Sequence, residues 1–420
     1  RCRAPGTRWE REVLSQHARR DVAVLDGDNL VLGGAARRIV AGGLAVGAVG
    51  LGGGFLLGSA AGDGMRHFLH AWLLNWLFFL SLSLGALWFV PLQHLTRSTW
   101  SAVVRRLAEI VSGTLPLMAL LSLPVLLNLG DIYVWADPAR VAGDPLLEHK
   151  AGWLSPGFFT LRIALYFAVW ILLATIFRRR SLRQDATGDP AITAGSERLG
   201  GPALILYGLT QTFAAFDLLM SLDAHWFSTM FGVYWFAGIV ASFFAVMTLL
   251  TAGLQRSGRL VHAVTLEHYN DYGRAMFAFI FFWAYIAFSQ YMLIWYANIP
   301  EETGWYLRRQ QNGWSAVGYL LIFCHWLLPF AGLMSRFTKR RVRLMAFWAA
   351  WILVMHWVDL FWLIMPELSP GGIPLRLMDA ALLVGMGGLY AAMLAWVAGP
   401  RLLVARRDPR LRASLNFENY

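Results

Sequence analysis

Ten long apolar runs constrain the fold of this chain more than any other feature. The hydrocarbon core of a bilayer is about 30 Å thick, so a spanning helix needs roughly 20 apolar residues. Runs of that length lie at 39–60, 69–90, 107–128, 158–177, 203–221, 227–253, 275–297, 315–334, 344–365 and 377–398. A membrane β-strand would instead alternate polar and apolar residues over about ten positions. The sequence therefore predicts an all-α membrane protein with about ten transmembrane helices.

The lysines and arginines predict which way the helices run. If the ten runs all span, 29 of the 36 Lys and Arg residues fall on the side that holds both chain ends. The other side holds six, and Arg162 lies inside a span. Because cytoplasmic loops are enriched in these residues, both termini are predicted to be cytoplasmic. Residues 1–35 would form a cytoplasmic segment, residues 36–400 one ten-helix domain, and residues 401–420 a cytoplasmic tail. The sequence begins without Met, which leaves the true start open.

The formal charge of +11 does not indicate nucleic-acid binding, because the arginines form short clusters between apolar runs. The chain has only two cysteines, Cys2 and Cys324. This number excludes an iron–sulfur cluster or a CxxCH haem attachment within the chain, and no metal site is predicted. Haem b held by His325 and His356 is a weaker alternative, since the two histidines are predicted to lie at different depths.

Ionisable residues inside predicted spans are the first candidates for a functional site, because a charge in the bilayer interior is costly. Asp217, His356 and Asp359 are predicted in the outer part of the membrane, and His325 near its centre. His356 and Asp359 are three positions apart and therefore share one helix face. We predict that these four residues form a proton relay. A structural ion pair between Asp217 and Arg162, with His356 bonded to a backbone carbonyl, is the alternative.

Further titratable residues are predicted near the outer side of the membrane. Arg162, Asp223 and His225 are candidates for an outer cavity or for the vicinity of a quinone, and Asp379 falls at a similar depth. Two outer segments, 129–157 and 298–314, are too interrupted by Pro and Gly to span the membrane. Both are rich in aromatic side chains, among them Trp135, Trp153, Trp305 and Tyr306. We expect these segments to lie over the outer face beneath a partner protein.

A second polar group is predicted at the cytoplasmic side, where the seventh span begins. The segment HAVTLEHYND contains His262, Glu267, His268 and Asp271. This density of titratable groups suits a proton entrance formed by Glu267, His268 and Asp271. Capping of the helix start is the competing interpretation, because polar residues often serve that purpose.

Three strings in the sequence carry a resemblance to a known family. They are HLTRSTWSAVVRRLAE (94–109), DLLMSLDAHWFSTMFGVYWFAG (217–238) and FSQYMLIWYANIPEET (288–303). They resemble the ten-helix quinone-site subunit 2 (ActF) of bacterial alternative complex III, which is of the NrfD or polysulfide-reductase membrane-subunit type. The likeness runs from about residue 35 to residue 400.

The resemblance implies a fold, a location and partners. Spans two to five and six to nine would form two four-helix bundles, with spans one and ten peripheral, in the bacterial inner membrane. The partners would be a paralogous ten-helix subunit, an iron–sulfur subunit and multihaem cytochrome c subunits, surrounded by lipid. Haem c and iron–sulfur clusters would belong to those partners, whereas this chain would bind no redox cofactor and its binding of quinone is left open.

The function implied by the resemblance is that of a membrane subunit of a respiratory quinol:electron-acceptor (cytochrome c) oxidoreductase, supporting proton translocation. A secondary transporter and a structural anchor without a proton role are the alternatives. A transporter would be expected to show helix breaks at matched positions of two repeats. Pro116 and Pro124 interrupt span three, but span seven has no such interruption.

Overall fold

The computed structural model describes residues 22–63 and 65–419, so the start of the predicted N-terminal segment, with Cys2, lies outside the described residues. In the described part, ten helical segments are long and apolar enough to cross a membrane. They are α2 (Gly34–Ser59), α3 (Arg66–Leu95), α4 to α6 (Arg105–Leu127), α10 (Pro156–Thr187), α11 with η4 (Pro190–Leu222), α12 (Phe231–Arg256), α13 (Leu266–Ala297), α15 to α16 (Trp314–Met334), α18 (Val342–Leu368) and α19 (Leu377–Ala398). The prediction of an all-α protein with about ten membrane helices is confirmed.

Two of these segments are interrupted, and shorter helices connect the spans. The third span consists of α4 (Arg105–Ser112), α5 (Leu115–Leu121) and α6 (Leu123–Leu127), and the eighth of α15 (Trp314–Leu320), the π-helix η5 (Leu321–Leu327) and α16 (Leu328–Met334). The remaining short helices are η1 (Val22–Gly27), η2 (Trp100–Val103), α7 (Leu129–Ile132), η3 (Val134–Ala136), α8 (Pro138–Val141), α9 (Pro145–Lys150), η4 (Met220–Leu222), α14 (Pro300–Arg308), α17 (Arg336–Lys339) and α20 (Leu411–Leu415).

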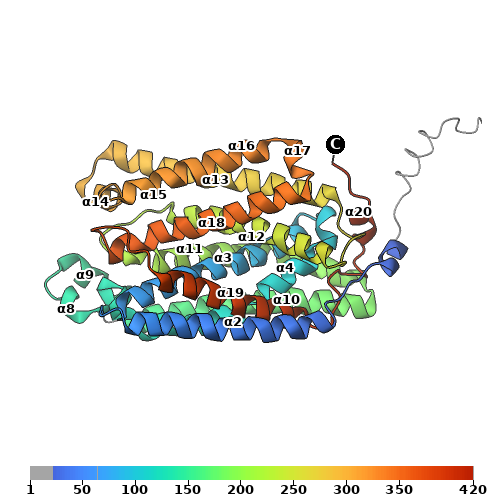
Figure 1. The fold of residues 1–420 in the computed structure, drawn as a ribbon, viewed down its shortest axis with the longest axis horizontal. Helices are drawn as coiled ribbons and strands as arrows, with labels where there is room; N and C mark the ends of the chain where they lie inside the picture. Colours follow the sequence, from blue (N-terminus) through green and yellow to red (C-terminus); the bar gives the residue numbers. More distant parts are fainter. Residues whose placement is uncertain (1–21, 64, 420) are drawn as a thin grey trace, which may run out of the picture.

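The long helices run side by side, and both ends of the described chain lie at the same end of the bundle (Figure 1). We call this the terminal end. Asp28 accepts hydrogen bonds from the backbone of residues 261–263 there, and Leu403 donates to the carbonyl of Leu30. The opposite end, called the loop end, carries α8, α9 and α14.

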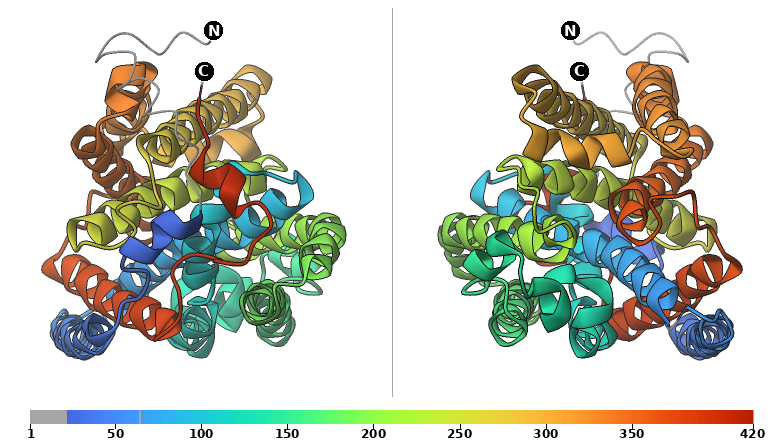
Figure 2. Two further views of the ribbon diagram at one scale, coloured as in Figure 1. Left: turned by 90° about the vertical axis from the view of Figure 1, so that its right-hand side faces the viewer. Right: turned by 90° about the vertical axis from the view of Figure 1, so that its left-hand side faces the viewer.

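The helices of spans two to five pack together, as do those of spans six to nine. The first group contains α3, α4 to α6, α10 and α11, and the second contains α12, α13, α15 to α16 and α18. Helix α3 joins the groups by packing against α12 and α18. It is the central helix, since 94% of its apolar membrane-spanning stretch is buried inside the protein. Figure 2 shows α2 and α19 together at the edge of this arrangement. This is the arrangement expected for two four-helix bundles with two peripheral helices.

Glycines hold the first and last spans together. In α2 the buried residues are Ala36 and four glycines, Gly47, Gly50, Gly54 and Gly58. A methyl group on Gly50 would lie 2.5 Å from Cα of Gly385 in α19. Such close approach of two backbones is a common way for membrane helices to associate without a hydrophobic driving force.

This contact predicts unequal effects of two similar substitutions. Gly50→Ala should destabilise the α2–α19 pair by about 1–3 kcal/mol, because the added methyl overpacks a backbone contact. Gly53→Ala is the matched control, since a methyl group there meets nothing within 4 Å. Thermal unfolding of the detergent-solubilised variants should show a lower midpoint for Gly50→Ala only. Equal midpoints would contradict the tight packing at Gly50.

Three helices continue well beyond their apolar runs at the terminal end. Helix α10 extends to Thr187 and α11 begins at Pro190, so most of the predicted 178–202 connection is helical. Helix α13 begins at Leu266, nine positions before its predicted apolar run. Hydropathy marks the part of a helix within lipid, whereas Arg, Gln and Leu favour helix in water as well. The pattern of apolar residues therefore could not predict these helical extensions.

The two outer segments lie over the loop end, but most of their aromatic side chains point into the chain itself. Trp135 and Trp305 are each 4% exposed, whereas Trp153 is 43% exposed. Trp135 donates to the carbonyl of Ser221, and Trp305 stacks on Trp226 with ring centroids 4.4 Å apart. Contacts within the chain thus explain much of the aromatic content that suggested a covering partner, and such a partner stays a prediction.

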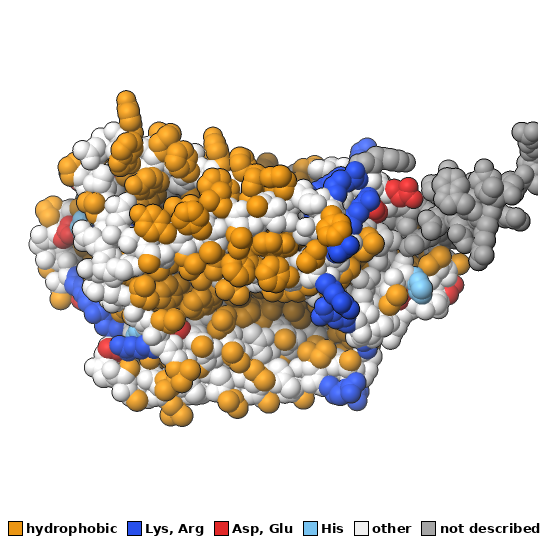
Figure 3. Space-filling model, turned by 45° about the horizontal axis from the view of Figure 1, so that its top comes forward, with side chains coloured by type: hydrophobic (Ala, Val, Ile, Leu, Met, Phe, Trp, Pro, Cys, Tyr) orange, Lys and Arg blue, Asp and Glu red, His pale blue; other side chains and the backbone are white. Residues whose placement is uncertain are grey.

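The surface has the pattern of a multi-pass membrane protein. In Figure 3 a belt of apolar side chains covers the middle of the visible face, while Lys and Arg side chains gather toward its ends, most of them at the terminal end. Large apolar side chains such as Leu165, Phe288 and Tyr296 are exposed on the long helices. Apolar side chains exposed in such numbers require lipid around the bundle.

Candidate functional site

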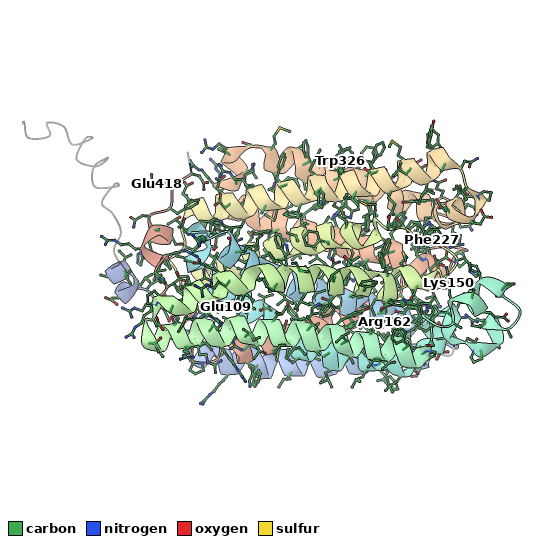
Figure 4. The ribbon with its side chains drawn as sticks, turned by 180° about the vertical axis from the view of Figure 1, so that it is seen from behind. Glu109, Lys150, Arg162, Phe227, Trp326 and Glu418 are labelled. Atoms are coloured by element: carbon green, nitrogen blue, oxygen red, sulfur yellow. The ribbon has the colours of Figure 1, made fainter. Side chains whose placement is uncertain are left out.

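Asp217 is held by a buried arginine near the loop end. It lies one position before the end of α11, and Arg162 reaches it from α10. Nε and Nη2 of Arg162 donate to the two carboxylate oxygens of Asp217 over 2.9 and 2.8 Å. Tyr166 and Trp153 also donate to this carboxylate, over 2.8 and 3.3 Å. Figure 4 shows Arg162 in this half of the molecule, and Glu109 toward the other end.

The bidentate geometry compensates the charge of Asp217 fully. A guanidinium fork that faces a carboxylate is among the strongest hydrogen-bonded pairs in proteins. The aromatic rings of Trp153 and Phe158 pack on the same guanidinium, with its carbon 4.2 and 4.5 Å from the ring centroids. Asp217 therefore has the contacts of a structural ion pair, which was the alternative to its role in a relay.

Asp359 has a different environment in the second bundle. It lies on α18, is 2% exposed, and accepts hydrogen bonds from two side chains on neighbouring helices. The Tyr234 hydroxyl on α12 donates to Oδ1, and the indole N–H of Trp283 on α13 donates to Oδ2 over 3.2 Å. Within the described part of the chain, Asp359 forms no ion pair with Lys, Arg or His. It is a buried carboxyl group with donors but without a counter-charge.

His356 lies beside Asp359, one helical turn earlier on α18. The ring packs against Phe78, with centroids 5.9 Å apart, and against Gly238 of α12. A methyl group on Gly238 would lie 3.0 Å from Nδ1 of His356 and 3.9 Å from Oδ2 of Asp359. The absence of a side chain at Gly238 thus leaves space for the imidazole. Both ring nitrogens of His356 are buried without a hydrogen-bond partner among the described residues. The predicted bond from His356 to a backbone carbonyl is not among the contacts.

His325 completes this group of residues. It lies in the π-helix η5, and its ring meets the edge of Trp283 with centroids 4.3 Å apart. Its two ring nitrogens are also buried without a described partner. Single π-helical turns occur often at functional sites. Trp283 therefore connects the carboxylate of Asp359 with the imidazole of His325, and we call Tyr234, Trp283, His325, His356 and Asp359 the Asp359 cluster.

The hydrogen bonds divide the predicted relay into two parts. Asp217 is bonded to residues of α10 and of the segment before it, whereas Asp359 is bonded to residues of α12 and α13. His356 and His325 belong with Asp359. In the described part of the chain, no hydrogen bond joins Asp217 to any of the other three. The structure therefore brings together three of the four predicted relay residues.

The other predicted outer residues tie the outer segments to the bundle. Asp223 is paired with Arg308, and His225 bonds Asp144 over 2.7 Å. A backbone hydrogen bond from Leu147 and the side-chain hydrogen bond from His225 lower the pKa of Asp144. Asp379 bonds His67 over 3.1 Å and accepts from the backbone of Arg376 in a capping box. His225 donates its backbone N–H to Asp223 over 3.1 Å, but no hydrogen bond in the described part of the chain joins Arg162 to either residue, although the three were predicted to share an outer cavity.

At the terminal end, the predicted proton entrance is covered by the chain's own tail. His268 forms a capping box with Thr265 at the start of α13. Glu267 pairs with Arg340 over 2.9 Å and accepts from the backbone of Asn419 over 3.2 Å. Asp271 accepts from Arg274 over 3.2 Å. Capping and tail contacts therefore account for these residues, in line with the competing interpretation.

The rings of the two buried histidines lie against other protein side chains. Among the described residues, no group of three or more His, Cys, Asp and Glu side chains could hold a metal ion. Trp283 packs on the ring of His325, and Phe78 packs on the ring of His356. A cavity of about 500 Å³ at the loop end is lined by other residues, among them Phe55, Trp72 and Asp131.

Three members of the site were not predicted from the sequence: Tyr234, Gly238 and Trp283. The sequence contained one indication of the first two, because Tyr234 and Gly238 are four positions apart and therefore share a face of α12. Trp283 carried no signal, since its role depends on a contact with a residue 76 positions away.

Comparison of the sequence with models of protein families and with curated proteins finds no match. The case for a function therefore depends on the site.

Proposed function

We propose that this chain is the proton-handling membrane subunit of a bacterial respiratory complex that oxidises quinol and reduces an electron acceptor such as cytochrome c. Its sequence strings resemble the corresponding subunit of alternative complex III, and the terminal end, rich in Lys and Arg, would face the cytoplasm. Quinol oxidation releases two electrons and two protons. In this proposal the electrons pass through metal centres of partner subunits, and this chain conducts protons.

The observation that carries the proposal is the Asp359 cluster. An uncompensated carboxyl group in the membrane interior is costly and is usually functional. Two buried imidazoles whose ring nitrogens have no partner among the described residues can each accept a proton at one nitrogen and release one from the other. Buried polar atoms of this kind commonly bind internal water. Asp359 and the two histidines would therefore exchange protons through intervening water.

Polar groups lead from this cluster toward both ends of the bundle. Toward the loop end, Gln290 accepts from Ser228 over 2.8 Å and donates to Tyr306 over 3.0 Å. Burial raises the pKa of Tyr306, so its hydroxyl stays protonated at neutral pH. Toward the terminal end, buried hydroxyls continue along α12 at Ser242, Thr248 and Thr251. These groups supply a route along which a hydrogen-bonded path could form.

Arg309 forms a buried ion pair at the loop end of this route. It is 1% exposed, pairs with Glu367 over 3.1 Å, and donates to the carbonyl of Leu363 over 2.8 Å. Burial lowers the pKa of Arg309 to about 10, which still leaves the guanidinium charged at neutral pH. Glu367 therefore neutralises this charge, and the buried pair holds the end of α14 against α18 beside the route.

The two alternatives receive less support. The interrupted spans are the third and the eighth, which are not matched positions of two four-helix bundles, and α13 is continuous from Leu266 to Ala297. A transporter would be expected to show matched breaks. A purely structural anchor would suit the Arg162–Asp217 pair, but it offers no reason for the uncompensated Asp359.

Affinity purification of the tagged chain from mild detergent tests its place in the complex. We expect the preparation to contain c-type haem, iron–sulfur clusters and quinol:acceptor activity. The subunit separated from its partners should show no redox absorbance, because it lacks the cysteines that hold such centres. A chain that purifies alone while quinol oxidation stays in another fraction would contradict the proposal, as would stoichiometric haem in the pure subunit.

A further inference from the structure

A cavity of about 660 Å³ opens at the terminal end between α10, α19 and the interrupted third span. Ser112, Gly113 and Pro116, at the interruption of the third span, line it. Helix α4 ends at Ser112 and α5 begins at Leu115, with Pro116 at its second position. In the end-on views, α10 and α19 lie on either side of these short helices at the edge of the bundle (Figure 2).

Three arginines line the rim of this cavity, Arg178 and Arg179 on α10 and Arg401 after α19. Arg178 is half-buried and donates to the carbonyl of Val397, whereas Arg179 and Arg401 are exposed. None of the three forms an ion pair with an acidic side chain in the described part of the chain. By contrast, the nearby Arg106 pairs with Asp185 over 2.7 Å, and Arg410 pairs with Glu197.

Apart from Ser112 and Thr175, the side chains in the rest of the cavity wall are apolar. Ile171, Ala174 and Met393 line it, together with Trp396, which is 67% exposed. An indole ring exposed at the end of a membrane helix is typical of the level of the lipid headgroups. The site therefore combines uncompensated cations at headgroup depth with an apolar wall that continues toward the bilayer interior.

We infer that this cavity binds one anionic phospholipid, with its phosphate against the guanidinium groups and an acyl chain along Ile171 and Met393. Guanidinium groups recognise phosphate oxygens through paired hydrogen bonds. Basic pockets between transmembrane helices bind the headgroups of anionic lipids in this way. A zwitterionic lipid would bring its own positive charge toward the three arginines, and a free phosphate ion would leave the apolar wall unused.

Native mass spectrometry of the delipidated protein, in complex with any partners that co-purify, tests this inference. Phosphatidylglycerol and phosphatidylcholine with the same acyl chains would be added separately, and inorganic phosphate would serve as competitor. We expect one phosphatidylglycerol to remain bound per chain, with phosphatidylcholine binding much more weakly. Phosphate should not displace the lipid.

Two double variants make the test specific. In Arg179→Gln/Arg401→Gln, affinity for phosphatidylglycerol should fall roughly 25-fold, at about fivefold for each arginine near a membrane surface. Arg341→Gln/Arg343→Gln is the matched control, since both arginines are exposed and lie at the start of α18, away from the cavity. Weak binding of phosphatidylcholine should be equal in all three proteins, which also shows that the variants are folded.

Several results would overturn the inference. Wild-type affinity of the Arg179/Arg401 variant for phosphatidylglycerol would show that these arginines do not form the site. An equal loss in the control variant would show attraction to a charged surface only. Displacement of the lipid by inorganic phosphate would identify the ligand as a free anion. None of these results bears on the Asp359 cluster, so the inference stands or falls separately from the proposed function.

Discussion

Asp217→Asn is expected to destabilise the protein by about 3–5 kcal/mol, because it leaves the buried Arg162 guanidinium without its counter-charge. Asp217 is 1% exposed and Arg162 5% exposed, so solvent cannot replace the lost partner. The variant should accumulate to a lower level in membranes and unfold at a lower temperature in detergent.

Two further variants separate this effect from a general sensitivity of the loop end. Arg162→Met/Asp217→Asn removes both charges and should recover most of the lost stability, as when a buried ion pair is replaced as a whole. Arg140→Gln breaks the exposed pair of Arg140 with Asp137 and should change stability by less than about 1 kcal/mol. A stable Asp217→Asn protein with reduced proton yield would instead restore Asp217 to the relay.

Asp359→Asn is expected to have the opposite profile, with stability largely retained and proton translocation lost. The asparagine has the shape of the protonated acid, and no cation is left unpaired, because Asp359 has no ion-pair partner among the described residues. Its carbonyl can still accept from Tyr234. It cannot release a proton, so the proton yield per quinol in proteoliposomes should fall toward the two protons released chemically by quinol itself.

Asp131→Asn is the matched control for this measurement, since Asp131 is an exposed carboxylate near the loop end. It should leave both stability and proton yield unchanged. An Asp359→Asn complex that turns over and translocates protons at the normal yield would show that this carboxyl group is only structural.

The spans could be predicted from the sequence because their signal is local. Each apolar run is long enough by itself to indicate a membrane helix, and the last run, 377–398, coincides with α19. The helical extensions beyond the membrane could not be predicted from hydropathy. For example, residues 178–187 are mostly polar and yet continue α10, because helix formation in water needs no apolar character.

The site could be predicted only in part, because its contacts join distant positions. The spacing of His356 and Asp359 is local and indicated a shared face. What distinguishes Asp359 from Asp217 is the choice of partner, an arginine 55 positions away in one case and a tyrosine 125 positions away in the other. No pattern within a single span encodes that difference. The ion pair of Asp217 with Arg162 was therefore an open alternative until the helices were packed.

The most direct test of the account is infrared difference spectroscopy of the complex during quinol oxidation, which detects a carboxyl group that gains or loses a proton. The account predicts a carboxylic-acid band that changes with turnover in the wild-type complex and in Asp131→Asn, and that is absent in Asp359→Asn. A band that persists unchanged in Asp359→Asn would contradict the account, because another group would then carry the proton.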